Sequence, residues 1–232
     1  MIGNSVVALS AKELGGFFDN EIGGWERAYA YASNEQKLAD YIKKVPVREH
    51  EWDRRHVPYE IANAEHLAMS DGAGMINLSH FAIFDLEGPD AEAFLNYVCG
   101  ANLSVPAGKI VYTQFLNARG GIEADVTVTR LSETAYLVVT PAVTRLADQT
   151  WLNRHKGDRR VVVTDVTAGE AVLAVMGPNA RTLLNKVSPN DFSNAVNPFG
   201  TAQDIELGMG MARVHRVTYV GELGWELYIP TE

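Results

Sequence analysis

The feature of this sequence that most constrains its fold is a short motif that occurs twice. Gly88-Pro89-Asp90-Ala91 follows an apolar stretch and precedes a run with apolar residues at helical spacing. Gly177-Pro178-Asn179-Ala180 repeats this arrangement in the second half of the chain, and Asp or Asn after the proline favours the start of a helix. A Gly-Pro turn is common and explains either copy alone, but it explains the pair poorly. We therefore predict an α+β fold of duplicated split-βαβ (ferredoxin-like) units with antiparallel sheets.

The remaining pattern divides the chain into a leader and a core. Residues 1–57 are polar and irregular, and we expect an extended leader with one short helix near 34–43. Residues 58–232 are expected to form the core, as two interleaved subdomains. Helices are expected at 59–70, at 90–98 and from 141, and strands at 75–78, 81–86, 110–116, 122–130, 136–140, 161–166, 171–176, 212–219 and 225–229. The Gly120-Gly121 pair between two of these strands is typical of a hairpin turn.

Charge and hydropathy exclude several classes of partner. The chain carries 29 acidic and 20 basic residues, a formal net charge of −9, which argues against nucleic-acid binding because that function requires a positive face. No apolar run is long enough to span a membrane. The first residues have neither the charged start nor the long apolar stretch of a secretory signal. We expect a cytoplasmic protein, with an organellar matrix as the other default.

Several common catalytic motifs are missing. Gly72-Ala73-Gly74 and Gly208-Met209-Gly210 each fall one glycine short of a dinucleotide-binding fingerprint, and no phosphate-binding Walker loop or Gly-x-Ser-x-Gly elbow occurs. His50 and His56 are too far apart for the helical pair of a zinc protease. Cys99 is alone, so it forms no internal disulfide, and we expect it to be a packed core thiol. We expect no metal site.

Two acidic residues lie inside otherwise apolar strands. Asp125 ends the segment that begins at Asn117, and it is either solvated on an outer face shared with Thr127 and Thr129 or held in a polar pocket. Glu226 poses the same question at the end of a segment that begins at Tyr219. Tyr219 itself is either a half-buried strand aromatic or a pocket residue.

Together these two segments resemble the glycine-cleavage T-protein family of tetrahydrofolate-binding aminomethyltransferases. Residues 117–125 match the family's Asn-x-x-Gly-Gly-Ile-x-x-Asp hairpin, and residues 219–226 match its Tyr-x-Gly-Glu-x-Gly-Trp/Phe-Glu turn. Leu78-Ser79-His80 and both Gly-Pro helices agree as well. Gly24-Trp25-Glu26-Arg27 makes the chain more similar to the folate domains of sarcosine and dimethylglycine dehydrogenases. The resemblance covers nearly the whole chain.

The sequence departs from the T-protein pattern at two positions. Ala124 stands where T-proteins carry the first of two consecutive acids, and the resulting single-acid version is similar to the dehydrogenase-linked branch. Thr140 stands where T-proteins place an asparagine. The family's C-terminal barrel has no counterpart before Glu232, and we expect the chain to lack that domain.

The resemblance implies a function and a set of site residues. It implies tetrahydrofolate as the cofactor and capture of a methylene unit from an amine-derived iminium ion, giving 5,10-methylenetetrahydrofolate. The expected partners are a small methylamine-type donor and a flavin-dependent dehydrogenase module. Asp125 is the implied catalytic residue, and the implied cofactor-binding residues are Tyr219, Glu226, Tyr112, Val138 and Phe81. The alternatives are a folate-dependent demethylase of another methylated substrate, a non-catalytic folate-binding relative and an inactive structural fragment.

Overall fold

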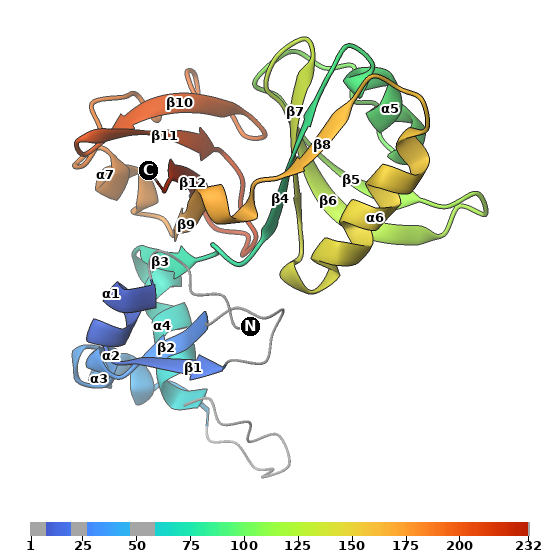
Figure 1. The fold of residues 1–232 in the computed structure, drawn as a ribbon. Helices are drawn as coiled ribbons and strands as arrows, with labels where there is room; N and C mark the ends of the chain where they lie inside the picture. Colours follow the sequence, from blue (N-terminus) through green and yellow to red (C-terminus); the bar gives the residue numbers. More distant parts are fainter. Residues whose placement is uncertain (1–7, 20–26, 47–58, 232) are drawn as a thin grey trace.

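The first of two five-stranded sheets is built around the first Gly-Pro motif. The computed structural model describes residues 8–19, 27–46 and 59–231 (Figure 1). Within them, the first sheet has the strand order β5-β6-β7-β4-β8, and every neighbouring pair is antiparallel. Its elements are β4 (Ala82–Glu87), α5 (Ala91–Val98), β5 (Ile110–Leu116), β6 (Ile122–Arg130), β7 (Ala135–Thr140), the 3-10 turn η2 (Ala142–Thr144), α6 (Arg145–Lys156) and β8 (Val162–Asp165).

The second sheet is built around the second Gly-Pro motif and is also antiparallel throughout. Its strand order is β10-β11-β12-β9-β3. Its elements are β3 (Gly74–Asn77), the 3-10 turn η3 (Thr167–Gly169), β9 (Glu170–Met176), α7 (Ala180–Leu184), β10 (Ala202–Leu207), β11 (Gly210–His215) and β12 (Gly224–Pro230).

The two sheets have the same topology, which explains the repeated motif. In each sheet, the strand before the Gly-Pro turn lies second from one edge, β4 in the first and β9 in the second. The next three strands of each unit then continue the sheet in reverse chain order. The edge position beside β4 is filled by β8, which follows in the chain, whereas the edge position beside β9 is filled by β3, which precedes it. The predicted α+β class with antiparallel sheets is confirmed.

Glycine is required at both Gly-Pro turns. Gly88 and Gly177 have φ angles of +147° and +120°, a region that side chains rarely adopt. A Cβ at either position would also collide with a backbone carbonyl oxygen, that of Arg160 for Gly88 and that of Met69 for Gly177. The motif is therefore a point of close backbone approach as well as a helix start.

Asp90 and Asn179 lie at the N-cap positions of α5 and α7, as predicted, but neither side chain makes a capping hydrogen bond to its helix. Asp90 Oδ2 instead accepts from the backbone N–H of Arg160 at 2.8 Å, and its Oδ1 accepts from the Arg160 guanidinium at 3.2 Å. Because Arg160 lies just before β8, this contact ties the edge strand of the first sheet to its Gly-Pro turn.

Helices cover one face of each sheet, and the other two faces pack together. Phe94 and Leu95 of α5 and Leu152 of α6 pack on the first sheet, and α7 packs on the second through Leu184 (Figure 1). The uncovered faces share a third core, which we call the inter-sheet core. Its buried residues are Met69, Leu78, Ile83, Leu137, Val139, Val172, Ala174, Met176 and Tyr228.

The N-terminal part has more regular structure than predicted. The described residues of the leader form α1 (Ala8–Glu13), the hairpin β1–β2 (Gly16–Asp19 and Arg27–Tyr31), α2 (Ser33–Lys37) and α3 (Ala39–Ile42), next to α4 (Tyr59–Asp71). Glu65 of α4 ties these parts together, because its Oε1 accepts from the Tyr31 backbone N–H at 2.9 Å and from Asn34 Nδ2 at 2.8 Å. Residues 24–26 of the Gly-Trp-Glu-Arg segment lie outside the described residues.

Two strand predictions differ from the structure. The predicted strand 212–219 is the shorter β11, so Tyr219 lies in the loop to β12. Strand β10 was not predicted, because Ala202–Leu207 alternates imperfectly and has few β-branched residues. It forms the outer edge of its sheet, where its charged side chains reach solvent. No helix in the described part of the chain is long and apolar enough to cross a membrane.

Candidate functional site

Asp125 is held by two donors from the neighbouring strand. The Tyr112 hydroxyl donates to Asp125 Oδ2 at 2.8 Å, and Gln114 Nε2 donates to Oδ1 at 3.1 Å. Both donors come from β5, on which Gln114 is the cross-strand partner of Asp125. The carboxylate is exposed, yet each of its oxygens has a fixed protein donor, so its orientation is set by the hairpin.

The face that carries Asp125 turns toward the second sheet. Alternate residues of β6 share a face, so Asp125 lies with Thr127 and Thr129. Thr129 is buried, and its cross-strand neighbour Leu137 packs in the inter-sheet core. Asp125 therefore occupies the open end of the inter-sheet face, and a purely outer-face position is excluded.

Glu226 faces the first sheet from the opposite side. Its side chain is 9% exposed, and it shares a face of β12 with Tyr228, which belongs to the inter-sheet core. Burial raises the pKa of the Glu226 carboxyl. The Tyr228 hydroxyl, which donates to Glu226 Oε2 at 2.9 Å, works in the opposite direction. The two acids therefore differ in environment: one is solvated and held by donors, and the other is buried.

Two of the predicted site tyrosines are exposed. Tyr112 is 66% exposed, and Tyr219, in the loop between β11 and β12, is 85% exposed. The pKa of Tyr112 is raised, first by its hydrogen bond to Asp125 and, as a smaller effect, by the nearby Tyr219 hydroxyl. Tyr112 thus contacts Asp125 directly, whereas Tyr219 is linked to Tyr112 only by this weak electrostatic effect.

Three buried polar atoms on the facing sides of the sheets have no hydrogen-bond partner in the described chain. They are Thr129 Oγ1 on the first sheet and His215 Nε2 and Glu170 Oε2 on the second. Buried polar groups in folded proteins nearly always have partners, so such atoms mark places where a polar ligand or water can bind. They lie on separate strands, Thr129 on β6, Glu170 at the start of β9 and His215 at the end of β11.

Val138 is not part of this arrangement. It lies on the opposite face of β7 from Leu137 and Val139, fully buried against α5 and α6. Its side chain packs in the core of the first sheet, on the opposite face of the sheet from Asp125, and its binding role stays a prediction. Phe81 is half-buried beside the inter-sheet core, with its ring centroid 5.0 Å from that of His80.

Asn117 shapes the hairpin that presents Asp125. Its Oδ1 accepts from the backbone N–H groups of Arg119 and Gly121, both at 2.9 Å, and its Nδ2 donates to Glu123 at 2.7 Å. A Cβ on Gly121 would meet the Asn117 amide at 2.8 Å. The Asn-x-x-Gly-Gly pattern therefore fixes the turn, and a register shift between Phe115 and Leu116 then places Gln114 opposite Asp125.

Four residues of this arrangement were not predicted from the sequence. They are Gln114, Thr129, His215 and Tyr228. Tyr228 could have been found by its spacing of two from Glu226. Gln114 could not, because the register of β5 against β6 shifts between Phe115 and Leu116, and regular pairing from the turn would place Ala124 opposite Gln114. His215 required the register between β11 and β12, which no local sequence signal gives.

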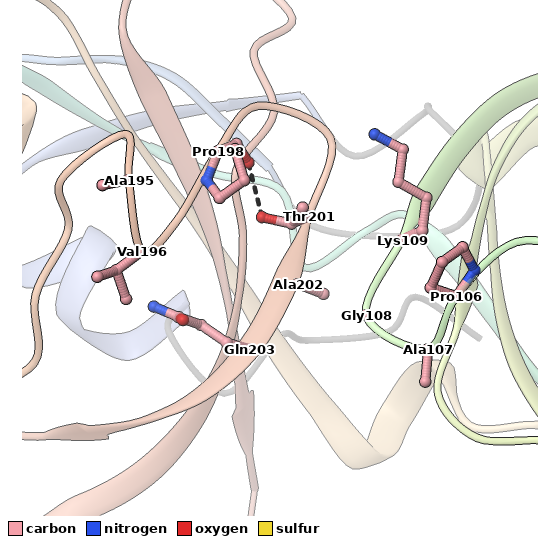
Figure 2. A pocket seen from close by; sticks show the side chains of 10 residues that line it. All are labelled: Pro106, Ala107, Gly108, Lys109, Ala195, Val196, Pro198, Thr201, Ala202 and Gln203. Carbon is pink, nitrogen blue, oxygen red and sulfur yellow. Dashed lines mark hydrogen bonds between the residues drawn. The ribbon is translucent and has the colours of Figure 1, made fainter.

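A separate pocket of about 400 Å³ opens where the edges of the two sheets meet. Figure 2 shows residues 106–109 on one side of it and residues 195–203 on the other. The two loops are joined by backbone hydrogen bonds from Ala202 N to Gly108 O at 2.7 Å and from Ile110 N to Gly200 O at 2.9 Å. None of the predicted site residues lines this pocket. Within the described ranges, no group of three His, Cys, Asp or Glu side chains is placed to hold a metal ion.

Comparisons with known proteins agree with this architecture. Residues 10–232 match the family model described as GCVT N-terminal domain. The chain is 38% identical over 217 residues to 4-methylaminobutanoate oxidase (formaldehyde-forming) of Paenarthrobacter nicotinovorans, which covers 93% of this chain and 25% of that protein. It is 34% identical over 190 residues to mitochondrial sarcosine dehydrogenase of Mus musculus, covering 74% of this chain and 20% of the relative.

The likeness extends to aminomethyltransferases themselves. The aminomethyltransferase of Listeria monocytogenes serotype 4a (strain HCC23) is 33% identical over 184 residues, covering 78% of this chain and 49% of the relative. The crystal structure of glycine cleavage system aminomethyltransferase T from Bartonella henselae superposes with a TM-score of 0.75 at 23% identity, covering 99% of this chain and 54% of that one. The chain thus spans about half or less of the length of these relatives. On this evidence, the chain belongs to the aminomethyltransferase (GCVT) family, and its relatives include sarcosine and dimethylglycine dehydrogenases.

Proposed function

We propose that this chain is a tetrahydrofolate-dependent one-carbon transfer module that captures a methylene unit from an amine-derived iminium ion and gives 5,10-methylenetetrahydrofolate. The observation that carries the proposal is the placement of two unlike carboxylates, Asp125 and Glu226, on the facing sides of two sheets. One is buried enough to anchor a ligand, and the other is exposed enough to receive a reactant.

Glu226 is suited to anchor the pterin ring. A pterin edge carries adjacent N–H donors, and a carboxylate accepts two such donors at once in charge-assisted hydrogen bonds. Each of these bonds contributes about 1.5–3 kcal/mol. The exposed rings of Tyr219 and Tyr112 offer flat surfaces beside it, and the unpartnered Thr129 Oγ1 offers a further polar contact. The residues present therefore fit this ligand.

Asp125 is suited to the chemical step. Tetrahydrofolate supplies the nitrogen atoms that take up the one-carbon unit. The Asp125 carboxylate, fixed by Tyr112 and Gln114, places a negative charge where a cationic iminium donor arrives and can accept a proton there. Because both holding donors lie on the adjacent strand, the carboxylate needs little reorientation during the reaction.

The relatives suggest where the iminium ion comes from. Several bear names of amine oxidases or dehydrogenases, and this chain matches only a fraction of each. We propose a flavin-dependent dehydrogenase module as the partner that oxidises a methylamine-type donor. The name of one relative specifies formaldehyde formation, which favours a second candidate function. In it, the flavin of the partner module oxidises the methylamine, and water hydrolyses the resulting iminium ion to formaldehyde and the free amine.

One experiment separates these functions. A purified flavin-dependent sarcosine oxidase generates the iminium ion in the presence of this chain and tetrahydrofolate, and both 5,10-methylenetetrahydrofolate and free formaldehyde are quantified. Formation of the methylene product above the uncatalysed background, and its loss in Asp125→Asn, supports one-carbon transfer. One-carbon transfer is rejected if the same amount of methylene product forms with and without the chain and anaerobic titration calorimetry detects no heat of tetrahydrofolate binding.

A further inference from the structure

A buried polar cluster on the second sheet surrounds Glu226, and two of its three members have no role in the proposal so far. It consists of Glu226 and Tyr228 on β12 and His215 on β11, and we call it the Glu226 cluster. His215 is the cross-strand partner of Glu226, and His215 and Tyr228 are each 1% exposed. All three side chains lie on the face toward the first sheet.

The contacts within the cluster hold its side chains in place. The Tyr228 hydroxyl donates to Glu226 Oε2 at 2.9 Å. The His215 ring lies against the Tyr228 ring, with centroids 4.2 Å apart and the planes tilted by 36°. No protein donor in the described chain contacts Glu226 Oε1, and His215 Nε2 is buried without a partner. The arrangement therefore holds one oxygen of the carboxylate and leaves the other unused.

The cluster contains no cation to neutralise Glu226. Burial, with a smaller contribution from the neighbouring Arg213, lowers the pKa of His215 to about 3, so the imidazole is neutral at physiological pH. Other charged groups face the same space from the adjacent strands: Arg213 on β11, Glu170 on β9, Asp85 on β4 and Asp204 on β10. None of these four perturbs the pKa of Glu226, which responds to burial and to Tyr228.

We propose that Tyr228 and His215 are positioning residues for ligand binding: Tyr228 fixes Glu226 Oε2, His215 fixes the Tyr228 ring, and the carboxylate is thereby presented to the N–H donors of a bound pterin. This inference rests on the proposed function for the identity of the ligand. The positioning itself is a property of the free chain and is measurable without any ligand.

The physical reason for such a device is the cost of burying a carboxylate. A buried carboxyl group without donors takes up a proton instead of remaining charged, and a protonated carboxyl is a poor acceptor for two N–H groups. The hydroxyl of Tyr228 stabilises the anion without placing a full positive charge beside it. An arginine there would compete with the ligand for both oxygens.

The first test measures Glu226 in the absence of ligand. Glutamate labelled with ¹³C at the side-chain carboxyl is incorporated into the 232-residue chain, and the Glu226 resonance is assigned by its loss in Glu226→Gln. Tyr228→Phe removes one hydroxyl and keeps the ring, so we expect the pKa of Glu226 to rise. His215→Leu should also raise the pKa of Glu226, because the Tyr228 ring is then free to move. An unchanged pKa in Tyr228→Phe overturns the inference, whatever the chain binds.

The matched control is Tyr136→Phe. Tyr136 is equally buried, but its hydroxyl contacts Glu92 and the Leu103 carbonyl in the core of the first sheet. Loss of this hydroxyl should lower stability without moving the pKa of Glu226. If both tyrosine variants shift it alike, the effect is general loosening and positioning is rejected.

The second test adds tetrahydrofolate under anaerobic conditions. Tyr228→Phe should weaken its binding about tenfold, the effect of losing one hydrogen bond to a charged group. The fall in affinity toward acid pH should begin at a higher pH than in the wild type, whereas the turnover rate at saturating tetrahydrofolate should stay the same. If Tyr228→Phe binds tetrahydrofolate with the same affinity and pH profile as the wild type, the positioning role is refuted. No binding by the wild-type chain, with the shifted Glu226 pKa still present, refutes the proposed function and the ligand named here but not the internal contact.

Discussion

Replacing Glu226 by glutamine should change stability and ligand affinity in opposite directions. The substitution keeps the shape and one carbonyl oxygen to which Tyr228 can still donate, but it removes a charge from a side chain that is only 9% exposed. Because burial raises the pKa of Glu226, the charged form costs free energy in the folded chain. Glutamine has no such cost, so we expect Glu226→Gln to be more stable than the wild type at neutral pH.

The pH dependence fixes the sign of this expectation. The folded-state pKa of Glu226 lies above its ordinary value of 4.5. Below this ordinary value, the carboxyl is protonated in both the folded and the unfolded chain, and the chain has its full stability. As the pH rises through the folded pKa, the buried carboxyl must give up its proton, and stability is lost. The stability of the variant should therefore match that of the wild type below about pH 4.5 and exceed it at pH 7. Urea unfolding at pH 4 and pH 7, followed by circular dichroism, measures both differences.

The affinity for tetrahydrofolate should fall in the same variant. If Glu226 accepts two N–H donors as an anion, an amide can replace at most one of these contacts. The loss of one charge-assisted hydrogen bond, about 1.5–3 kcal/mol, corresponds to a roughly 10- to 100-fold increase in the dissociation constant. Anaerobic titration calorimetry measures this change. The control is Glu206→Gln, the same chemical change at an exposed position on β10, which should leave both quantities near wild type.

Two results would refute the reasoning. A variant that is less stable than the wild type at pH 7 would show that the Glu226 charge is compensated in the folded chain, contrary to its burial and single donor. A variant that binds tetrahydrofolate as tightly as the wild type would remove Glu226 from the site. A stability gain without an affinity loss would leave Glu226 a buried acid that serves another purpose.

Three further predictions follow from the site and the fold. Asp125→Asn should lower the rate of methylene transfer by about 100-fold or more while the dissociation constant of tetrahydrofolate stays within a few fold, as measured by product formation and calorimetry. Gly177→Ala should destabilise the chain far more than Gly120→Ala in urea unfolding: both have positive φ, but only Gly177 has carbonyl oxygens where a Cβ would lie. Similar losses in the two glycine variants would refute the close-approach argument. Cys99, buried with its pKa raised to about 12, should react with Ellman's reagent at pH 8 only as the chain unfolds, and rapid labelling of the native chain would contradict its burial.

The sequence predicted the strands whose periodicity is strong and failed where position depends on neighbours. Strands β5 and β6 have the predicted bounds, because their alternating apolar residues flank a two-glycine turn. Strand β10 has no such pattern and is held by pairing with β11. Local propensity is a weak guide for an edge strand, since its stability comes from pairing.

The faces of the site residues could not be read from local sequence. A step of one residue along a strand changes the face, so Val138 packs against helices while Leu137 and Val139 line the inter-sheet core. The resemblance located Asp125 and Glu226 along the chain. Only the packing of two sheets shows that both acids lie on facing sides, and only the register shows that His215 lies beside Glu226.

The duplicated architecture explains how one chain produces two acids of different character. Strand for strand, β6 of the first sheet corresponds to β11 of the second, and β7 corresponds to β12. Asp125 lies on β6 and Glu226 on β12, so the acids occupy non-equivalent strands of the two copies. Duplication therefore supplied two similar sheets that bury their uncovered faces against each other, and each copy contributes a different strand to the space between them. Asp125 lies beside an edge strand, where solvent reaches it, whereas Glu226 lies on the central strand of its sheet, where burial is greatest. This difference in strand position accounts for one carboxylate that stays solvated and another that must be held by a buried tyrosine.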